Sequence, residues 1–497
     1  MSSSDQRPQR KAKGLSKSRF VHGCQCPKCL WWETYEPDAP ELVPDAALED
    51  IFEQGHRVGE LARQRFPGGE LIDLDHRDPA REPKTRELLA AGVPAVFEAT
   101  FIADHTYAAI DVLLRERKGF ALIEVKSGKT ADEKYFLDAA VQAHVARSAG
   151  IDVRRVEIMH LNPDYVHPGP ADLFARDDIT DQVEVLVRDI PAKISELMGV
   201  LEGDLPAVRI GPQCTAPMDC PFVSRCWPQD LDSVLRIPRM QYAKRFELYH
   251  AGKRSVADLP AGVKLNPVQR RHVHAVVSGE TVVEHVLREA LEQYQGRLGF
   301  LDFETVARAV PVWDGTKPWE MIPAQFSYHE GPIGGPYTHQ EFIAEPGRDP
   351  RRPLAKRLVE VTRGAEKVVM YTGFEATQIR YLQTSVPELA AELGTLLGKL
   401  VDLKKTVEQH VYHPEFGGGF SIKDVLPALV PGMSYEDAGE ITEGTAASAL
   451  LAKLILDPSL SNADREKLRA GLLKYCKLDT WAMVKLLEKL SELAGSR

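Results

Sequence analysis

Long apolar runs are missing from this sequence. No stretch of the 497 residues approaches eighteen consecutive apolar residues, so no membrane-spanning helix is predicted. The opening segment, MSSSDQRPQRKAKG, has no apolar region of the kind that a secretory signal needs. We therefore expect residues 1–14 to be a disordered basic tail. We also expect a cytoplasmic protein with no membrane partner.

An excess of positive charge is also missing. Lys and Arg number 62 against 72 Asp and Glu, which gives a formal net charge of −10. A nucleic-acid partner usually requires a basic surface, so the overall charge gives no support to one. It does not exclude one, because clustered catalytic acids can outweigh a local basic patch. The composition, 43% hydrophobic and 27% charged, is typical of a globular chain, and its length predicts two or three domains.

Cysteine is scarce, with seven residues in the chain. In a reducing cytoplasm these thiols are expected to be free or metal-bound. Six of them form two groups on either side of residues 30–213: Cys24, Cys26 and Cys29, then Cys214, Cys220 and Cys226. One upstream and three downstream thiolates would supply four ligands for an iron–sulfur cluster or a zinc site. The long downstream intervals favour the cluster, whereas Cys476, on a C-terminal helix, is expected to be packed.

Two apolar stretches, YAAIDVLLRE and GFALIEVKSG, read as neighbouring strands that carry acids. A strand directs residues i and i+2 to one face, so Glu124 and Lys126 should point the same way. The turn-prone ERKG between the stretches predicts a hairpin that brings Asp111 alongside. Such a set would hold Mg²⁺ or Mn²⁺ through oxygen, and the lysine would neutralise phosphate charge. Solvated strand ends are the alternative interpretation.

Three neighbours strengthen this interpretation. Glu98 stands among apolar residues in the preceding predicted strand, AVFEATF. His56 lies on an upstream helix, where a neutral imidazole can serve as a metal ligand, although packing is an alternative role. Gln142 lies on the helix after the lysine strand, where it could bind phosphate or water.

A second set of acids lies in the C-terminal half. GFLDFET places Asp302 and Glu304 on one strand face, and Tyr475 and Asp479 share a helix face one turn apart. Glu375 begins a helix between them, and Asp402, on the strand KLVDLKK, is a weaker candidate for the same position. Acids from a first strand, a middle helix and a last helix can converge on two metal ions. Solvated or capping acids are the alternative.

The first set resembles the RecB-like branch of the PD-(D/E)xK nucleases. The resemblance rests on a helix histidine, an aspartate, a Glu-x-Lys pair and a following glutamine, in that order: His56, Asp111, Glu124, Lys126 and Gln142. The branch often has a tyrosine four residues after the glutamine, where this chain has Ala146. The string CPKCLW resembles the start of the iron–sulfur members, which selects Cys26 as the first ligand of a [4Fe–4S] cluster with Cys214, Cys220 and Cys226. Cys24 and Cys29 remain possible substitutes.

The second set resembles DEDD-type exonucleases of the ribonuclease-H-like fold. Asp302-x-Glu304 is similar to their first motif, and Tyr475 with Asp479 is similar to the tyrosine form of their last motif. The resemblance implies that Tyr475 orients the attacking water and that Asp302, Glu304 and Asp479 bind metal. The middle motif normally supplies Asp, so Glu375 would have to replace it.

The expected fold class is α/β, because predicted strands near 95–103, 107–115 and 119–126 alternate with helices. A further strand, VRRVEIMHL, and a long helix near 178–202 should complete the first half. We expect a RecB-like nuclease domain with an iron–sulfur staple at 15–231, a helical connector at 232–295 and a ribonuclease-H-like domain at 296–497. The connector contains no obvious strand; it either touches nucleic acid or is a solvated spacer.

These features predict a metal-dependent nuclease, an exonuclease acting on ends or single strands, with DNA favoured over RNA as its partner. One alternative keeps the chemistry in the RecB-like half and leaves the C-terminal domain to bind nucleic acid. Another is a non-catalytic binding or assembly protein. DNA repair and defence against phage DNA are both compatible biological roles.

Overall fold

The computed structural model describes residues 14–435, 441 and 443–495, so nearly all of the predicted basic tail lies outside the described residues. The chain divides into two compact units. Unit 1 comprises residues 1–44, 48–227 and 308–319, and unit 2 comprises residues 45–47, 228–307 and 320–497. Strands and helices alternate in both units, which confirms the α/β class. Every helix in the described part of the chain is too short or too polar to cross a bilayer.

Unit 1 is built on a seven-stranded mixed sheet in the order β2-β3-β4-β5-β6-β7, with β1 paired to β4. Its strands are β1 (Leu15–Ser16), β2 (Glu70–Leu71), β3 (Ala95–Ala103), β4 (Thr106–Arg115), β5 (Phe120–Val125), β6 (Val153–Leu161) and β7 (Phe174–Asp178). The strands β3, β4 and β5 run antiparallel in succession, and β5 and β6 run parallel. The predicted β4–β5 hairpin is confirmed, and a hydrogen bond from Glu116 N to Gly119 O (3.1 Å) closes it.

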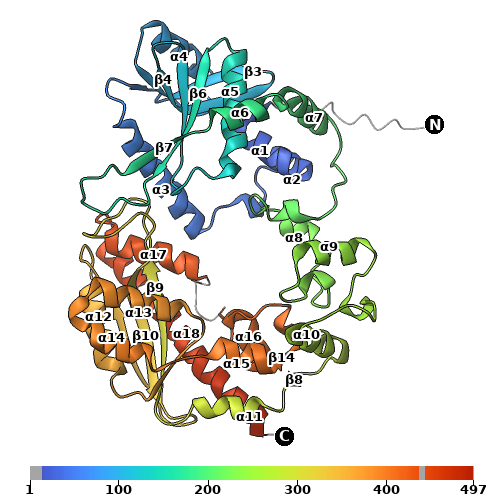
Figure 1. The fold of residues 1–497 in the computed structure, drawn as a ribbon, viewed down its shortest axis with the longest axis vertical. Helices are drawn as coiled ribbons and strands as arrows, with labels where there is room; N and C mark the ends of the chain where they lie inside the picture. The colour runs from blue at the N-terminus through green and yellow to red at the C-terminus, as the bar shows by residue number, and fades with distance from the viewer. Residues whose placement is uncertain (1–13, 436–440, 442, 496–497) are drawn as a thin grey trace. The chain divides into compact units, whose positions relative to one another are not determined.

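Helices cover both faces of this sheet (Figure 1). The helices of unit 1 are α1 (Lys17–Gln25), α2 (Pro27–Tyr35), α3 (Ala46–Arg63), α4 (Arg81–Ala90), α5 (Phe136–Ser148), α6 (Thr180–Val187), α7 (Ile190–Glu202) and α8 (Val223–Cys226). The helices α1, α5, α6 and α7 share one apolar core with the sheet. On the other face, Val58 and Ala62 of α3 and Ala309 pack against the strands.

Two predicted helices of unit 1 differ in detail. The single long helix expected near 178–202 is two helices, α6 and α7, because Pro191 has no N–H to donate and occupies the first turn of α7. The upstream helix expected to carry His56 is α3. Val58 is buried, but Ile51 and Phe52 are about half exposed (49% and 51%), so only part of the apolar pattern faces the core.

The alternation of faces is interrupted at Glu98. Val96, Ala99 and Phe101 all face the α5 side of the sheet. In a regular strand, residues 96 and 99 would face opposite sides, so the alternation of β3 shifts by one residue between them. The alternation of β4 shifts in the same way at the facing position, because Ile110 and Leu113 both face the α5 side. The register is the same on both sides of the break, but Glu98 and Asp111, between the pairs Phe97–Val112 and Ala99–Ile110, are not themselves paired. Glu98 has a φ of +59°, in the left-handed region that non-glycine residues rarely adopt. This local twist leaves Glu98 and Asp111 opposite each other in the register.

Unit 2 contains a five-stranded sheet in the order β11-β10-β9-β12-β13. Its strands are β9 (Leu298–Val306), β10 (Ile322–Gly331), β11 (Thr338–Ile343), β12 (Lys367–Met370) and β13 (Leu400–Asp402). The first three neighbours in this order run antiparallel, whereas β9, β12 and β13 run parallel. A separate two-stranded pair joins β8 (Val282–Val283) to β14 (Val411–Tyr412).

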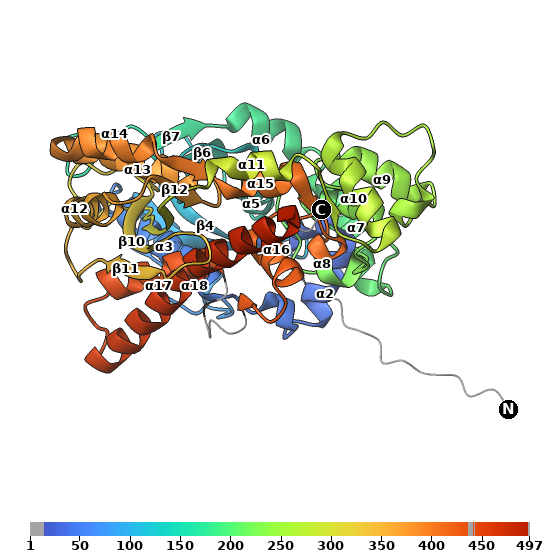
Figure 2. The same cartoon turned by 90° about the horizontal axis from the view of Figure 1, so that it is seen from below.

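Helices pack on both faces of the five-stranded sheet as well. The larger helices of unit 2 are α9 (Tyr242–His250), α10 (Pro267–Ser278), α12 (Arg351–Thr362), α13 (Phe374–Ser385), α14 (Ala390–Leu397), α15 (Leu403–His410), α16 (Ile422–Leu429), α17 (Gly444–Leu456) and α18 (Asn462–Gly495), with the short α11 (Leu287–Ala290). Leu301 and Phe303 of β9 face α12–α14, and Phe300 faces the α15 and α18 side. The long α18 runs along β9 and β10 (Figure 2). By the same alternation, Asp302 and Glu304 face α18.

The segment expected to be a helical connector, 232–295, contains α9, α10 and α11 and also one strand, β8, of two residues. So short a strand carries too few residues to show an alternating pattern, which is why the sequence did not reveal it. By its contacts, the segment belongs to unit 2.

Candidate carboxylate and thiol sites

Four of the residues predicted for the first site are brought together at the end of β5. One carboxylate oxygen of Glu124, Oε1, accepts a hydrogen bond from Lys126 Nζ at 2.7 Å. The other, Oε2, accepts from Gln142 Nε2 of α5, also at 2.7 Å. The Oδ2 atom of Asp111, on the neighbouring β4, accepts from Val125 N–H at 2.7 Å. Gln142 therefore orients the glutamate, and the hairpin holds the aspartate beside it.

A cavity of about 340 Å³ opens beside these groups. His56 of α3, Glu98 of β3 and Asp111 of β4 all line it. His56 is exposed. The buried Arg81 guanidinium contacts Glu98 twice, at the backbone carbonyl oxygen (3.3 Å) and at the carboxylate (3.6 Å). Among the described residues, His56, Asp111 and Glu124 do not form a set of three ligand atoms within 4.8 Å of one another. His56 and Asp111 thus face the same cavity, whereas Glu124 lies behind its wall and is buried.

Two charged residues of this site were not predicted. Lys17, the first residue of α1, places Nζ 2.9 Å from Glu124 Oε1. Asp138 of α5 accepts from Lys126 Nζ at 2.8 Å. The spacing of Asp138 and Gln142, one helical turn, was an available signal. Lys17 has no such local signal, because its contact is with a residue 107 positions away.

Burial and the neighbouring carboxylates set the electrostatics of this site. Burial, followed by the charge of Glu124, raises the pKa of Asp111 to about 7. For Glu124, burial alone would raise the pKa, but Lys126 and Lys17 outweigh it and hold the pKa below its ordinary value. A buried carboxyl that shares its surroundings with an ionised one favours a divalent cation, because the cation relieves the repulsion. The oxygen-rich donor set fits Mg²⁺ or Mn²⁺.

In unit 2, Asp302 and Glu304 of β9 and Asp479 of α18 lie close enough to share a metal ion. One ligand atom from each lies within 4.8 Å of the others. Tyr475, one turn before Asp479, is buried on the same helix. Cys476, predicted to be packed, is buried, and its Sγ lies 3.5 Å from Asp302 Oδ2.

The two candidates for a middle acid differ in their surroundings. Glu375, near the start of α13, is buried, and its Oε2 has no hydrogen-bond partner among the described residues. Burial is the main cause that raises the pKa values of Asp302 and Glu304, and the charge of Glu375 adds to it. Glu375 nevertheless lies outside the set of three acids within 4.8 Å. Asp402 is the N-cap of α15 and accepts from Lys405 N–H at 3.1 Å, which is the capping role considered as an alternative.

The pKa values of the three acids of unit 2 are all raised, chiefly because the acids are buried. Burial, then the charge of Asp479, raises the pKa values of Asp302 and Glu304 well above the ordinary range. Burial also raises the pKa of Asp479 to about 6, against a hydrogen bond from Tyr435 and the charge of Lys423. Tyr435 and Lys423 were not predicted. Both come from outside the motif segments, and only the tertiary fold brings them to the acids.

The two cysteine groups meet in unit 1. Cys26, Cys29, Cys220 and Cys226 share an apolar cluster with Trp32 and Phe222, and Cys214 is close enough to act electrostatically on Cys26 and Cys226. Gln25 Nε2 donates to Gln213 O (2.8 Å) and Met218 O (2.6 Å), which ties α1 to the downstream segment. Cys24 instead packs against the main core of unit 1. Upstream, the fold therefore offers both Cys26 and Cys29 to the downstream thiols.

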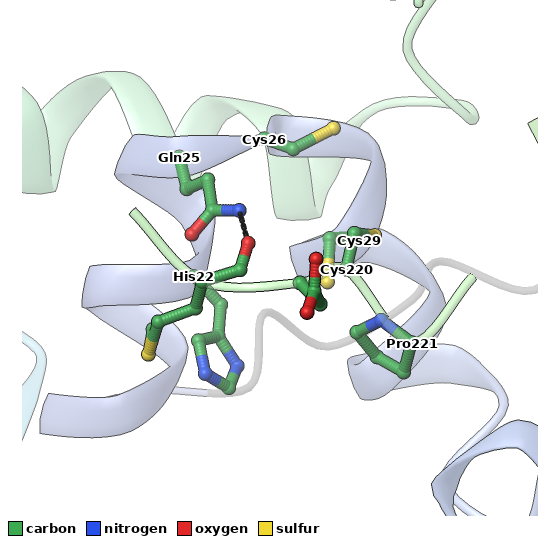
Figure 3. Close-up of a pocket in the computed structure, with 8 residues that line it drawn as sticks. His22, Gln25, Cys26, Cys29, Cys220 and Pro221 are labelled. Atoms are coloured by element: carbon green, nitrogen blue, oxygen red, sulfur yellow. Dashed lines mark hydrogen bonds between the residues drawn. The ribbon is translucent and has the colours of Figure 1, made fainter. Parts of the chain in front are cut away.

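Cys29 has a second set of neighbours. It lines a small pocket with His22, Cys26 and Cys220 (Figure 3). His22 Nδ1 lies 2.7 Å from Glu33 Oε1, and Cys29 Sγ lies 3.8 Å from the same oxygen. Among the described residues, the sets of three ligand atoms within 4.8 Å contain no cysteine other than Cys29. No three of the described cysteine sulfurs therefore lie within 4.8 Å of one another, although Cys29 and Cys220 are in hydrogen-bonding contact.

Comparisons with known proteins give little. A family model described as "Domain of unknown function (DUF2779)" matches residues 299–421, a range that includes Asp302, Glu304 and Glu375 and ends before Tyr475 and Asp479. No curated protein matches the chain. Among solved structures, the chain is similar to one titled "Crystal structure of SSO0001", with 12% identity and a TM-score of 0.24, over 44% of this chain and 87% of that one.

Proposed function

We propose that this chain is a metal-dependent nuclease that hydrolyses phosphodiester bonds, with DNA ends or single strands as its substrates. The observation that carries the proposal is the hydrogen-bonded set of Glu124, Lys126 and Gln142, with Asp111 beside it at a cavity. Within the proposal, unit 1 is a RecB-like core and unit 2 is ribonuclease-H-like. The order of helix, three antiparallel strands, helix and parallel strand in unit 1 supports the first assignment.

Each residue of the unit 1 site has a role in this proposal. Asp111 and Glu124 would hold the cation, with His56 and Glu98 completing the wall of the cavity. When bound, Mg²⁺ or Mn²⁺ would acidify a water molecule and polarise the scissile phosphate. Lys126 carries its positive charge to the phosphate oxygens, and Gln142 fixes the glutamate rotamer. Asp302, Glu304, Tyr475 and Asp479 would make a second centre in unit 2, with Glu375 nearby.

A test of the first centre uses end-labelled single- and double-stranded DNA and RNA with Mn²⁺ or Mg²⁺. We expect Glu124→Gln to lower the cleavage rate by about 10²-fold or more, because the variant keeps the shape of the side chain but not its charge. Lys134→Met, which removes an exposed lysine paired with Asp132, should cleave like the wild type. A wild-type protein that leaves every substrate uncut would contradict the proposal and favour a binding or assembly protein.

The second centre is tested by the double variant Asp302→Asn/Glu304→Gln on the same substrates. We expect it to lose one of the cleavage activities or polarities. If cleavage is unchanged while Glu124→Gln is inactive, only unit 1 is catalytic and unit 2 binds nucleic acid. The position of Glu375 outside the close set of acids is the observation that favours this second candidate function.

We further propose a [4Fe–4S] cluster held by Cys26, Cys214, Cys220 and Cys226 in unit 1. A cluster is favoured over zinc by the long intervals between the downstream cysteines, and by the finding that no three described sulfurs lie within 4.8 Å of one another. Anaerobic purification with iron, sulfide and zinc analysis tests this, and stoichiometric zinc without iron would refute it. We expect Cys226→Ser to lose iron, whereas Cys24→Ser, at a partly buried thiol that packs against the main core, should keep it. Cys29→Ser separates the two upstream candidates.

A further inference from the structure

The unit 1 site contains two lysines. Lys17 Nζ and Lys126 Nζ both donate to the same oxygen, Glu124 Oε1, at 2.9 and 2.7 Å. Lys126 also contacts Asp138 Oδ2 at 2.8 Å, while Lys17 lies 3.9 Å from Asp138 Oδ1. The side chains are exposed to a similar extent, 23% for Lys17 and 20% for Lys126. The two ammonium groups therefore contact the same carboxylate oxygen, and their side chains are similarly accessible to solvent.

The backbone fixes the position of Lys17. The preceding strand β1 pairs with Thr106 and Tyr107 of β4, the strand that carries Asp111. Ser16 caps α1 by accepting a hydrogen bond from Arg19 N–H (3.2 Å), so the helix begins at Lys17. The helix then packs against α5, which carries Gln142 and Asp138. Lys17 is thus held at the site by a strand, a cap and a helix contact, independently of its ion pair.

The two lysines differ in how firmly the acids hold them. Among the described residues, Lys126 has two acidic partners within 2.8 Å, whereas Lys17 has one within 3 Å. An ammonium group has three donors, so Lys17 retains the capacity to bind a further anionic oxygen. A cation bound by Asp111 and Glu124 would weaken the pull of Glu124 on both lysines. Lys17 is the one that can turn to a new partner at lower cost.

We propose that Lys17 is a second catalytic lysine, which contacts a non-bridging oxygen of the scissile phosphate. The inference rests on the proposed function and adds a residue to its site. The substrate class is a phosphodiester backbone. Lys17 supplies charge and a hydrogen bond, without forming a covalent bond or transferring a proton. Lys126 acts on the phosphate through its charge, from its position beside Glu124 and Asp138.

The test uses the full-length variants Lys17→Met, Lys17→Arg and, as matched control, Lys134→Met. With Ca²⁺ in place of Mn²⁺, and with binding read before any cleavage, Lys17→Met should bind single-stranded DNA more weakly than the wild type. The magnitude of the slope of log affinity against log salt should fall by about 1, as expected for one lost phosphate contact. Its single-turnover rate with Mn²⁺ should fall by about 10²-fold. Lys17→Arg should restore part of both, because the charge returns. Mn²⁺ affinity without DNA, measured by calorimetry, should not fall.

Other results would overturn the inference. If Lys17→Met binds DNA with the wild-type salt slope but loses Mn²⁺ affinity or thermal stability, Lys17 only supports Glu124. If it cleaves at the wild-type rate while Glu124→Gln is inactive, the inference fails and the proposed function stands. If the wild type cleaves nothing, the proposed function fails, and an unchanged salt slope in Lys17→Met would also remove the phosphate contact.

Discussion

At the scale of single residues, the chain concentrates carboxyl groups where they repel one another. Asp111 lies beside ionised Glu124, and Asp302, Glu304 and Asp479 crowd together in unit 2. Natural proteins rarely bury like charges without a compensating ligand, because each adds to the free energy of the folded state. Such groups are found at functional sites, and their protonation offers a direct experimental handle.

Replacing Asp111 by Asn should stabilise the metal-free protein at high pH. Folding raises the pKa of Asp111 from 3.8 to about 7, so the folded state binds the proton more tightly than the unfolded state does. The stability that this provides is present at acidic pH and is lost as the pH rises through about 7. We expect the Tm of the wild type in chelator to fall from pH 5 to pH 8, and that of Asp111→Asn to fall less.

Thermal melts at several pH values measure this difference. Asp152→Asn, which changes an exposed aspartate paired with Arg154, serves as the control and should follow the wild type. Added Mn²⁺ should raise the Tm of the wild type more than that of Asp111→Asn. A parallel pH dependence in wild type and Asp111→Asn would contradict the assignment.

At the scale of elements, β3 carries the most unusual backbone of the site. Glu98 adopts a left-handed conformation within a strand whose pairing continues on both sides. Strain of this kind persists when the surrounding structure enforces it, and it gathers at functional sites. Buried Arg81 holds the Glu98 carbonyl and Thr100 Oγ1 (3.0 Å), which explains how the strand keeps this shape.

Substitutions at Glu98 should separate backbone strain from side-chain chemistry. Glycine adopts a positive φ without steric cost, whereas alanine does not, so Glu98→Gly should be more stable than Glu98→Ala by about 1 kcal/mol. Chemical denaturation of the two variants measures this. At Ala99, which has ordinary strand geometry, glycine should instead be destabilising. Equal stability of the two Glu98 variants would mean that the left-handed conformation is absent in solution.

The strands and helices that carry acids were predictable because their apolar patterns are long and regular. Glu124, Lys126 and Gln142 follow from a period of two in one strand and from the helix after it. The shift of the alternation at Glu98 was not predictable, since it arises from one dihedral angle that leaves no trace in the composition of AVFEATF. Lys17 and Tyr435 were missed for another reason: their partners lie 107 and 44 positions away.

At the scale of the whole molecule, the chain order and the compact units do not coincide. Residues 308–319 belong to unit 1 by their contacts, although they come between β9 and β10 of unit 2. Within unit 1, Arg308 pairs with Asp50, Ala309 N–H donates to Gln54 Oε1 (2.6 Å) and Trp319 Nε1 donates to Ser127 O (2.5 Å). No local sequence pattern predicts that residues 308–319 pack in unit 1, because these contacts join residues far apart in the chain.

Removing the Arg308 side chain should therefore destabilise unit 1. Arg308 and Asp50 are largely buried, at 15% and 21% exposure, so Arg308→Ala should cost about 1–3 kcal/mol and speed hydrogen exchange in α3. The control is Arg57→Ala, on α3 like Asp50, which removes an exposed pair with Glu60 and should lower the free energy of unfolding by under about 1 kcal/mol. Exchange in α3 that is the same in both variants would show that segment 308–319 does not support unit 1.

The tie between Gln25 and the backbone at Gln213 and Met218 has a consequence for how the protein is made. A ribosome that adds roughly 5–20 residues per second needs about 10–40 s to synthesise the residues between the two ends of this tie. During that interval α1 and α2 have left the ribosome, but Phe222, against which Trp32 packs, does not yet exist. Until Phe222 is synthesised, the Trp32 side chain of the nascent chain has no aromatic partner to cover it. We expect it to be the part of the newborn chain that chaperones bind first.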